Sequence, residues 1–295
     1  MSLELKNVNF TYNPGTPMQQ DVLKDINVTI EKGEFLAIMG HTGSGKSTLI
    51  QHLNALVSPT SGQVLFDGQD IFAQGFDKRM LRSKVGMVFQ YPEHQLFEET
   101  VFEDICFGPR NLKLSEEEVK ARAEEAMKLT GVPDDFRERS PFELSGGQKR
   151  RVAIAGVLAM KPEYLILDEP TAGLDPGGRD EILDLLKELH EKSGISIILV
   201  SHSMEDIANY AQRILVLNAG RIVLSGTPRE VFRHADELAG YGLSVPQAAL
   251  IMHALKEKGF DVDTDANTVA EAKASILAAL AKRGVTAGKA GEADA

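Results

Sequence analysis

FLAIMGHTGSGKSTLIQHL, residues 35–53, is the stretch of this 295-residue sequence that decides the fold. Its first five residues are all apolar, as is typical of a strand buried on both faces. The apolar residues at its other end recur at helical spacing. Between them lies G-x-x-x-x-G-K-S, whose glycines let backbone N–H groups converge on an anion. The stretch therefore predicts a phosphate loop between a buried strand and a helix.

The loop predicts a nucleotide site, because the helix that follows adds the positive end of its dipole. We expect the Lys46 ammonium to neutralise the β- and γ-phosphates and the Ser47 hydroxyl to bind Mg²⁺. The other loop residues would surround the phosphates: Gly40, His41, Thr42, Gly43, Ser44, Gly45 and Thr48. A glycine-rich turn with a chance lysine is the alternative, and the flanking strand and helix argue against it.

Further apolar runs lie on either side of this stretch. Val85–Phe89, Tyr164–Leu167 and Ile195–Val200 also predict buried strands, and helical patterns separate them. Leu3–Tyr12 and the alternating residues 26–30 predict an antiparallel edge. We therefore expect an α/β fold with a mostly parallel sheet core of the P-loop NTPase type.

Two carboxylates, Asp168 and Glu169, follow the predicted strand Tyr164–Leu167. Ligands collect at the carboxyl ends of parallel strands, so Asp168 is placed to hold Mg²⁺ and Glu169 to polarise an attacking water. A solvated strand end is the alternative for this pair considered alone. The phosphate loop elsewhere in the chain favours the functional interpretation.

A second possible anion site begins at Leu144-Ser145-Gly146-Gly147-Gln148. Ser145 and Gln148 have the spacing of a capping box, and the two glycines leave N–H groups of the helix start bare. The chain's own nucleotide already has a loop, so this site would need a phosphate held by another protomer. Physical chemistry alone leaves a plain helix start equally open.

Net charge, cysteine content and the length of the apolar runs bear on the partners and the cellular setting of the protein. The net charge of −11 argues against nucleic acid as a partner. The single cysteine fits a reducing, cytosolic setting. We see no signal peptide at the start and no apolar run near the ~20 residues that cross a bilayer.

The sequence pattern changes near residue 225. Residues 213–218 and 221–225 predict a hairpin, and capping-box patterns begin at Ser115, Thr227, Ser244 and Thr268. Gly259 and Gly284 stand where helices would end. We expect a small helical appendage over 230–283 and a disordered tail over 284–295.

The motifs together resemble ATP-binding-cassette (ABC) ATPases. Residues 144–148 look like the family's signature motif. Tyr12 resembles its adenine-stacking aromatic, Gln90 its Q-loop glutamine, Asp175 its D-loop aspartate at the dimer interface, and His202 its switch histidine. The resemblance covers about residues 1–229 and implies a helical signature subdomain at about 91–160.

The resemblance also implies a mechanism. Two cassettes would sandwich two ATP molecules head to tail, each ATP lying on one protomer's Lys46 and beneath the other's signature residues Ser145, Gly146, Gly147 and Gln148. Gln90 would touch Mg²⁺, and Gln90, Glu169 and His202 would position and polarise the water. A regulatory module without turnover is the alternative, and these three residues speak against it.

Segments 40–43, 51–54 and 89–93 are similar to the A′-type ATPase of energy-coupling factor (ECF) transporters. That resemblance implies import of a vitamin or a transition-metal ion and a peripheral place on the cytoplasmic face of the cell membrane. The partners would be a second ATPase, a transmembrane scaffold that contacts residues 91–107, and a separate substrate-capture membrane protein. The apolar residues of that segment fit a partner surface and equally fit an ordinary core: Leu96, Phe97, Val101, Phe102, Ile105 and Phe107. The 230–283 appendage would help to form the ATPase dimer. Another ABC importer and a non-transport ABC ATPase remain alternatives, and the second ATPase is a copy or a relative.

Overall fold

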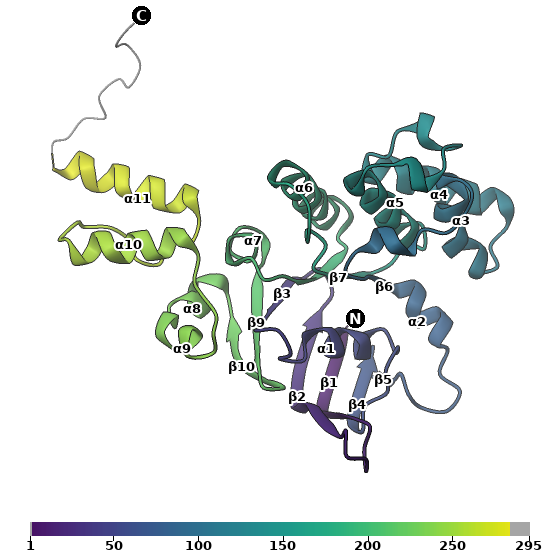
Figure 1. Cartoon of the computed structure of the whole chain (residues 1–295), viewed down its shortest axis with the longest axis horizontal. Coiled ribbons are helices and arrows are strands. Elements are labelled where there is room, and N and C mark those ends of the chain that lie inside the picture. The colour runs from purple at the N-terminus through teal and green to yellow at the C-terminus, as the bar shows by residue number, and fades with distance from the viewer. Residues whose placement is uncertain (1, 284–295) are drawn as a thin grey trace, which may run out of the picture.

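The computed structural model of the chain describes residues 2–283. Two β-sheets form its centre, a bundle of helices lies at one end, and the last helices of the described chain project at the other (Figure 1). The predicted α/β class, with a parallel core and an antiparallel edge, is confirmed. No helix among the described residues is long and apolar enough to span a membrane.

The larger sheet has six strands in the order β10-β9-β3-β8-β7-β6. All neighbours are parallel except β9 and β10, which form the predicted hairpin. The strands are β3 (Phe35–Met39), β6 (Val85–Val88), β7 (Tyr164–Asp168), β8 (Ser196–Val200), β9 (Arg213–Asn218) and β10 (Arg221–Gly226). Because β3, β6, β7 and β8 run parallel to one another, their carboxyl ends lie along the same side of the sheet.

The smaller sheet is antiparallel throughout, in the order β2-β1-β4-β5. Its strands are β1 (Ser2–Tyr12), β2 (Gln20–Glu31), β4 (Ser61–Phe66) and β5 (Gln69–Asp70). Its apolar residues share a core with α1 (Lys46–Leu53) and with one face of the larger sheet. Leu36 and Ile38 of β3 lie in this core, whereas Phe35, Ala37 and Met39 pack into cores that the chain's other helices line.

The other face of the larger sheet carries the helical subdomain and α6. The helices and 3₁₀ turns on this face are η1 (Pro92–Gln95), α3 (Val101–Asn111), α4 (Glu116–Thr130), η2 (Asp134–Phe136), η3 (Pro141–Glu143), α5 (Gly146–Leu158), α6 (Pro176–Ser193) and α7 (Met204–Tyr210). Helix α2 (Lys78–Lys84) lies on the first face, where its Leu81 joins the core around α1. Figure 1 shows α3, α4 and α5 bundled beyond the β6 edge of the sheet. They bury one continuous apolar core together with α6 and strand residues such as Leu165.

Four short helices end the described chain: α8 (Pro228–Phe232), α9 (Ala235–Gly240), α10 (Gln247–Glu257) and α11 (Val269–Lys282). The first two pack through Val231, Phe232 and Leu238 against Ala37 and Met39 of the central strand. The last two share a separate small core, which contains Met252 and Ala272. The division into 1–229 and 230–283 stays a prediction, and the predicted tail 284–295 lies outside the described residues.

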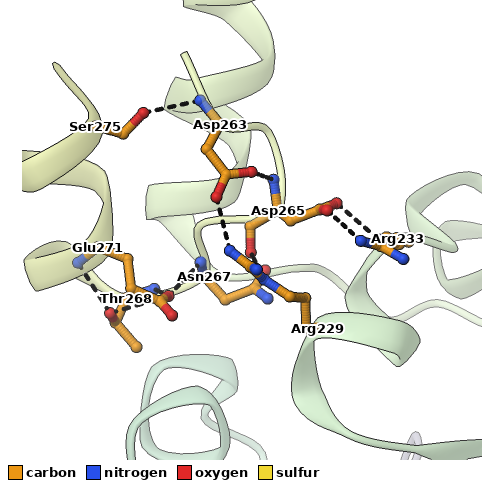
Figure 2. A network of polar contacts seen from close by, with 8 residues as sticks. All are labelled: Arg229, Arg233, Asp263, Asp265, Asn267, Thr268, Glu271 and Ser275. Atoms are coloured by element: carbon orange, nitrogen blue, oxygen red, sulfur yellow. Dashed lines mark hydrogen bonds and ion pairs between the residues drawn. The ribbon is translucent and has the colours of Figure 1, made fainter. Parts of the chain in front are cut away.

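Polar contacts tie α8 to the loop between α10 and α11 (Figure 2). Arg229 donates to Asp263 Oδ2 at 2.6 Å, and Arg233 Nε donates to Asp265 Oδ1 at 2.8 Å. The same loop is braced from the far side, where Ser275 Oγ accepts from the Asp263 N–H at 2.8 Å. Charged side chains therefore add to the apolar contacts of Val245 and Ala249 that hold the projecting helix pair to the rest of the chain.

The predicted capping boxes have different outcomes. Those of Thr227 and Thr268 are complete. Ser115 caps α4 with its hydroxyl, but Glu118 pairs with Arg122 instead of bonding back. The box at Ser244 is wrong, because Pro246 is the N-cap of α10 and the Ser244 hydroxyl donates to the Val245 carbonyl.

Candidate functional site

The phosphate loop connects β3 to α1 in a conformation that requires glycine. Gly45 has φ +106°, in the left-handed region, and is the N-cap of α1 without a side-chain cap. A Cβ on Gly40 would lie 2.4 Å from the Leu217 carbonyl oxygen. The loop closes through a hydrogen bond from the Ser44 N–H to the His41 carbonyl at 3.1 Å. The uncapped helix start leaves its first N–H groups free of side-chain acceptors.

Lys46 lies inside this loop and is only 6% exposed. Its ammonium donates to the carbonyl oxygens of Gly40 at 2.8 Å and His41 at 3.1 Å. Burial lowers the pKa of Lys46, and the charges of Glu169 and Asp168 partly oppose that shift. The cation is thus held beside two carboxylates, in a place where an anion would replace the two carbonyls.

Two observations test whether the loop fits a nucleotide with Mg²⁺. The Ser44 hydroxyl is buried and has no hydrogen-bond partner among the described residues. Ser47 donates a hydrogen bond to Asp168, which is 8% exposed. A hydroxyl and a carboxylate side by side suit Mg²⁺, which binds few protein ligands and completes its shell with phosphate oxygens and water. The residues of the loop and Asp168 therefore fit a nucleotide bound with Mg²⁺.

Burial raises the pKa of the Asp168 carboxyl, and the neighbouring charge of Glu169 adds to that effect. The Ser47 hydrogen bond and the Lys46 charge act in the opposite direction. A buried carboxylate whose charged form is disfavoured gains most from an added cation. Asp168 is therefore suited to a divalent ion brought in with the nucleotide.

The structure brings Glu169, Gln90 and His202 together. His202 Nε2 lies 2.8 Å from Glu169 Oε1, and Gln90 Nε2 donates to Glu169 Oε2 at 3.0 Å. An ionised carboxylate only accepts, so His202 Nε2 carries the hydrogen in this contact. The three residues follow β7, β6 and β8, whose carboxyl ends share one edge. The spatial order of the strands thus assembles residues far apart in sequence.

Tyr12 reaches the same region from the antiparallel sheet. Its hydroxyl lies 3.3 Å from the Thr48 hydroxyl on α1, and its ring packs edge-on against Phe10 with centroids 4.6 Å apart. The Tyr12 side chain remains half-exposed. A ring fixed at its edge and open on a face can stack on a planar base.

The signature residues form a helix start that closes on itself. The Gln148 N–H donates to Ser145 Oγ at 3.4 Å, and Gln148 Oε1 accepts from the Ser145 N–H at 2.9 Å. A Cβ on Gly146 or Gly147 would meet nothing within 4 Å. Asp175 behaves similarly: its Oδ1 accepts from the Gly178 N–H at 2.8 Å as the N-cap of α6. Local capping explains the contacts that these residues make within the chain.

The apolar residues of segment 91–107 divide into two groups. Leu96, Val101, Phe102 and Ile105 belong to the core of the helical subdomain. Phe97 and Phe107 are 57% and 43% exposed and meet edge to face, with centroids 4.8 Å apart. They line a cavity of about 490 Å³ between α2, α3 and α5.

Arg150 in α5 is a residue that the sequence analysis missed. It is 1% exposed and contacts the segments that carry both Gln90 and Glu169. A signal existed, because 149–151 is a basic run near the start of a helix, where the dipole disfavours cations. The pattern could have indicated a specific partner, although not which one.

Comparison with known proteins gives a consistent result. Residues 23–172 match the family described as "ABC transporter". The "Energy-coupling factor transporter ATP-binding protein EcfA2" of Caldanaerobacter subterraneus is 57% identical, covering 94% of this chain and 97% of that protein. The protein of the same name from Clostridium tetani is 53% identical, covering 94% and 96%.

Solved structures agree with these matches. CbiO1 from Clostridium perfringens, described as part of the ABC transporter complex cbiONQ, is 41% identical with a TM-score of 0.72, covering 86% of this chain and 98% of that one. A dimeric ATP-binding cassette bound to ADP and Pi is 34% identical with a TM-score of 0.68, covering 77% and 98%. The chain therefore belongs to the ABC transporter family, among the ATP-binding proteins of energy-coupling factor transporters.

Proposed function

We propose that this chain is the ATP-hydrolysing subunit of an ECF importer and that it hydrolyses ATP at a site completed by a second cassette. The contact of Glu169 with both Gln90 and His202, beside Lys46 and Asp168, is the observation that carries the proposal. It places a carboxylate, an amide and an imidazole around one point at the end of the sheet.

In this proposal the loop residues bind the phosphates. Lys46 exchanges the carbonyls of Gly40 and His41 for β- and γ-phosphate oxygens, and loop N–H groups donate to the same anion. Ser47 and Asp168 would hold Mg²⁺, which would neutralise charge on the phosphates. Tyr12 stacks on the adenine. Each group neutralises or positions, which is the main demand of phosphoryl transfer.

The carboxylate of Glu169 orients a water in line with the γ-phosphorus and accepts a proton from that water. The water oxygen forms a bond to phosphorus while the bond to the β-phosphate oxygen breaks, giving ADP and inorganic phosphate. Gln90 fixes the water from the side of β6, and His202 stabilises charge on the γ-phosphate. Gln90 and His202 contact the two carboxylate oxygens of Glu169, so the three side chains lie together at this point.

The second cassette would supply Ser145, Gly146, Gly147 and Gln148 to this ATP, and Asp175 would cross the interface. The open space around the two glycines supports this assignment, as does a similar cassette solved as a dimer with ADP and Pi. Closure on ATP and opening after hydrolysis would then drive transport. The second cassette would be a copy of this chain or a related ATPase.

We assign the groove beside Phe97 and Phe107 to a transmembrane scaffold. The chain would then lie peripherally on the cytoplasmic face of the cell membrane. A separate membrane protein would capture the substrate, a vitamin or a transition-metal ion, and nucleic acid is not a partner. The apolar, half-exposed pair supports a protein contact at this place.

The dependence of ATP hydrolysis on protein concentration tests the shared site. Specific activity should rise with concentration and level off as dimers form, because each site needs two chains. Full activity in a strictly monomeric preparation would overturn the proposal. Identifying the chains that purify with this protein from membranes tests the transport assignment separately.

A further inference from the structure

Arg150 makes an unusual set of contacts for a buried arginine. One terminal nitrogen donates to both carboxylate oxygens of Glu93, each at 3.1 Å. The other donates to the backbone carbonyls of Pro170 at 2.8 Å and Ala172 at 3.0 Å. The planar guanidinium holds its donors in a fixed fork, so these contacts define the relative positions of three chain segments.

Each of the three segments carries a residue of the candidate site. Glu93 lies in η1, shortly after Gln90, and Pro170 follows Glu169 directly. Arg150 itself lies in α5, less than two turns after Ser145. One side chain thus connects the signature helix to the two residues that would orient the water.

Stability alone is a weak explanation for this arrangement. A buried ion pair often contributes little net stability, because the cost of desolvating both ions offsets their attraction. The Arg150 Nε is also buried without an acceptor among the described residues. In addition, Glu169 has a left-handed backbone with φ +49°, a conformation that persists only where the surroundings enforce it. The two carbonyls that Arg150 holds belong to the turn directly after it.

We propose that Arg150 is a positioning residue, which fixes the Glu169 carboxylate and the Gln90 amide relative to the signature helix. The inference rests on the proposed ATP hydrolysis and adds a residue to it. Through this guanidinium, a displacement of α5 is passed on to both water-orienting groups. Turnover therefore depends on Arg150, whereas ATP binding at the loop does not.

The first test compares Arg150→Met with Arg213→Met in the ATPase dimer that the full-length chain forms with its second cassette, using MgATP and steady-state kinetics. Arg213 is a matched control, since it also donates to a carboxylate and a carbonyl, those of Glu34 and Thr29, but at the opposite ends of the strands. We expect Arg150→Met to lower kcat at least about tenfold with KM for ATP within about threefold. Arg213→Met should keep kcat within about twofold.

The double variant Glu93→Met/Arg150→Met separates positioning from stability. Removing both charges leaves no unpaired ion, so the melting temperature should recover relative to Arg150→Met. The carbonyls of Pro170 and Ala172 still lack their donor, so kcat should stay low. Recovery of kcat together with stability would show a structural role and overturn the inference.

If Arg150→Met does not fold, Glu93→Gln provides the same test with a milder change. It keeps a hydrogen-bond acceptor and removes the charge, and it should lower kcat by about threefold to tenfold without raising KM. An unchanged kcat, whether or not KM rises, contradicts the inference. The proposed hydrolysis is tested apart from it by Glu169→Gln, which should be inactive whatever Arg150 variants do.

Discussion

Two helices of this molecule begin with glycine-rich turns, and they use their N-termini differently. At the start of α1, Gly45 provides no side-chain cap, and the buried ammonium of Lys46 lies within the loop. At the start of α5, a complete capping box of Ser145 and Gln148 occupies two N–H groups, and open space surrounds the glycines. The first turn surrounds a buried cation of its own chain, whereas the second is exposed and surrounded by open space.

The difference indicates which half of the site is complete. Around α1, strands β6, β7 and β8 supply Gln90, Glu169 and His202 at hydrogen-bond distance. At the start of α5, the hydrogen bonds of Ser145 and Gln148 are those of the cap itself. If the site is divided in this way, as we propose, turnover requires a second chain and initial binding does not, and the following experiments test that division.

The largest expected effect is that of Glu169→Gln, in the part of the site around α1. Loss of the base should reduce phosphate release by about 100-fold or more, because general base catalysis contributes that much. ATP binding should persist and the closed dimer should accumulate, as measured by sedimentation. Glu163→Gln is the control, since Glu163 precedes the same strand at its other end and pairs with Lys32 and Lys84. Release of phosphate at the wild-type rate by Glu169→Gln would contradict its role.

Ser145→Arg tests the part of the proposed site at the start of α5. It should reduce hydrolysis by about 100-fold, the order seen when a preorganised donor to a developing anion is lost. ATP affinity of isolated protomers should change by less than about twofold. Ser115→Arg removes the comparable hydroxyl cap of α4 and controls for the loss of a cap. A large loss of affinity in isolated Ser145→Arg protomers would mean that the two halves are not separate.

Alanine at the two glycine turns should affect folding unequally. Gly45→Ala adds a Cβ 3.0 Å from both Leu23 Cδ2 and the Val22 carbonyl oxygen, at a left-handed φ, and should lower Tm by about 4 °C. Gly147→Ala meets nothing within 4 Å and should leave Tm within about 1 °C. Differential scanning calorimetry of the nucleotide-free chain measures both. Equal losses would show that α5 is as constrained within the chain as α1.

The smallest effect concerns pH and the buried carboxyl of Asp168. Because burial raises its pKa in the folded state, its contribution to stability is present below the unfolded pKa and is lost as pH rises through the folded pKa. Asp168→Asn removes that loss, so the nucleotide-free variant should melt about 2 °C above the wild type at pH 7. The difference should vanish near pH 4. A wild-type Tm equal to that of the variant at both pH values would exclude the burial effect.

Much of the architecture is predictable from local patterns. Phe35–Met39 is a strand with the predicted bounds, because five apolar residues between turn signals permit little else. The strand predicted from Ile195 begins one residue later, and the Ile195 carbonyl accepts from His190 Nδ1 at 3.0 Å. The Ser244 box failed since Pro246, with its fixed φ, already starts the helix. Local spacing predicts helices and strands well and competing caps poorly.

The candidate site shows a similar limit. Lys46, Asp168 and Glu169 are recognisable because each follows a strand that its own neighbours define. Arg150 is not, because its partners come from η1 and from the turn after β7, and only the packed structure places these next to α5. The roles of Gln90, His202 and the signature residues stay predictions until the variants above are measured.

The tether between α8 and the projecting helices has a consequence for behaviour in different media. Arg229 and Arg233 hold Asp263 and Asp265 through exposed ion pairs, which dissolved ions screen (Figure 2). The apolar seam of α10 and α11 does not depend on charge, and sulfate-like salts strengthen it. High ionic strength should therefore weaken these two contacts, while Leu243, Val245 and Ala249 still join the start of α10 to the core beside the central strand.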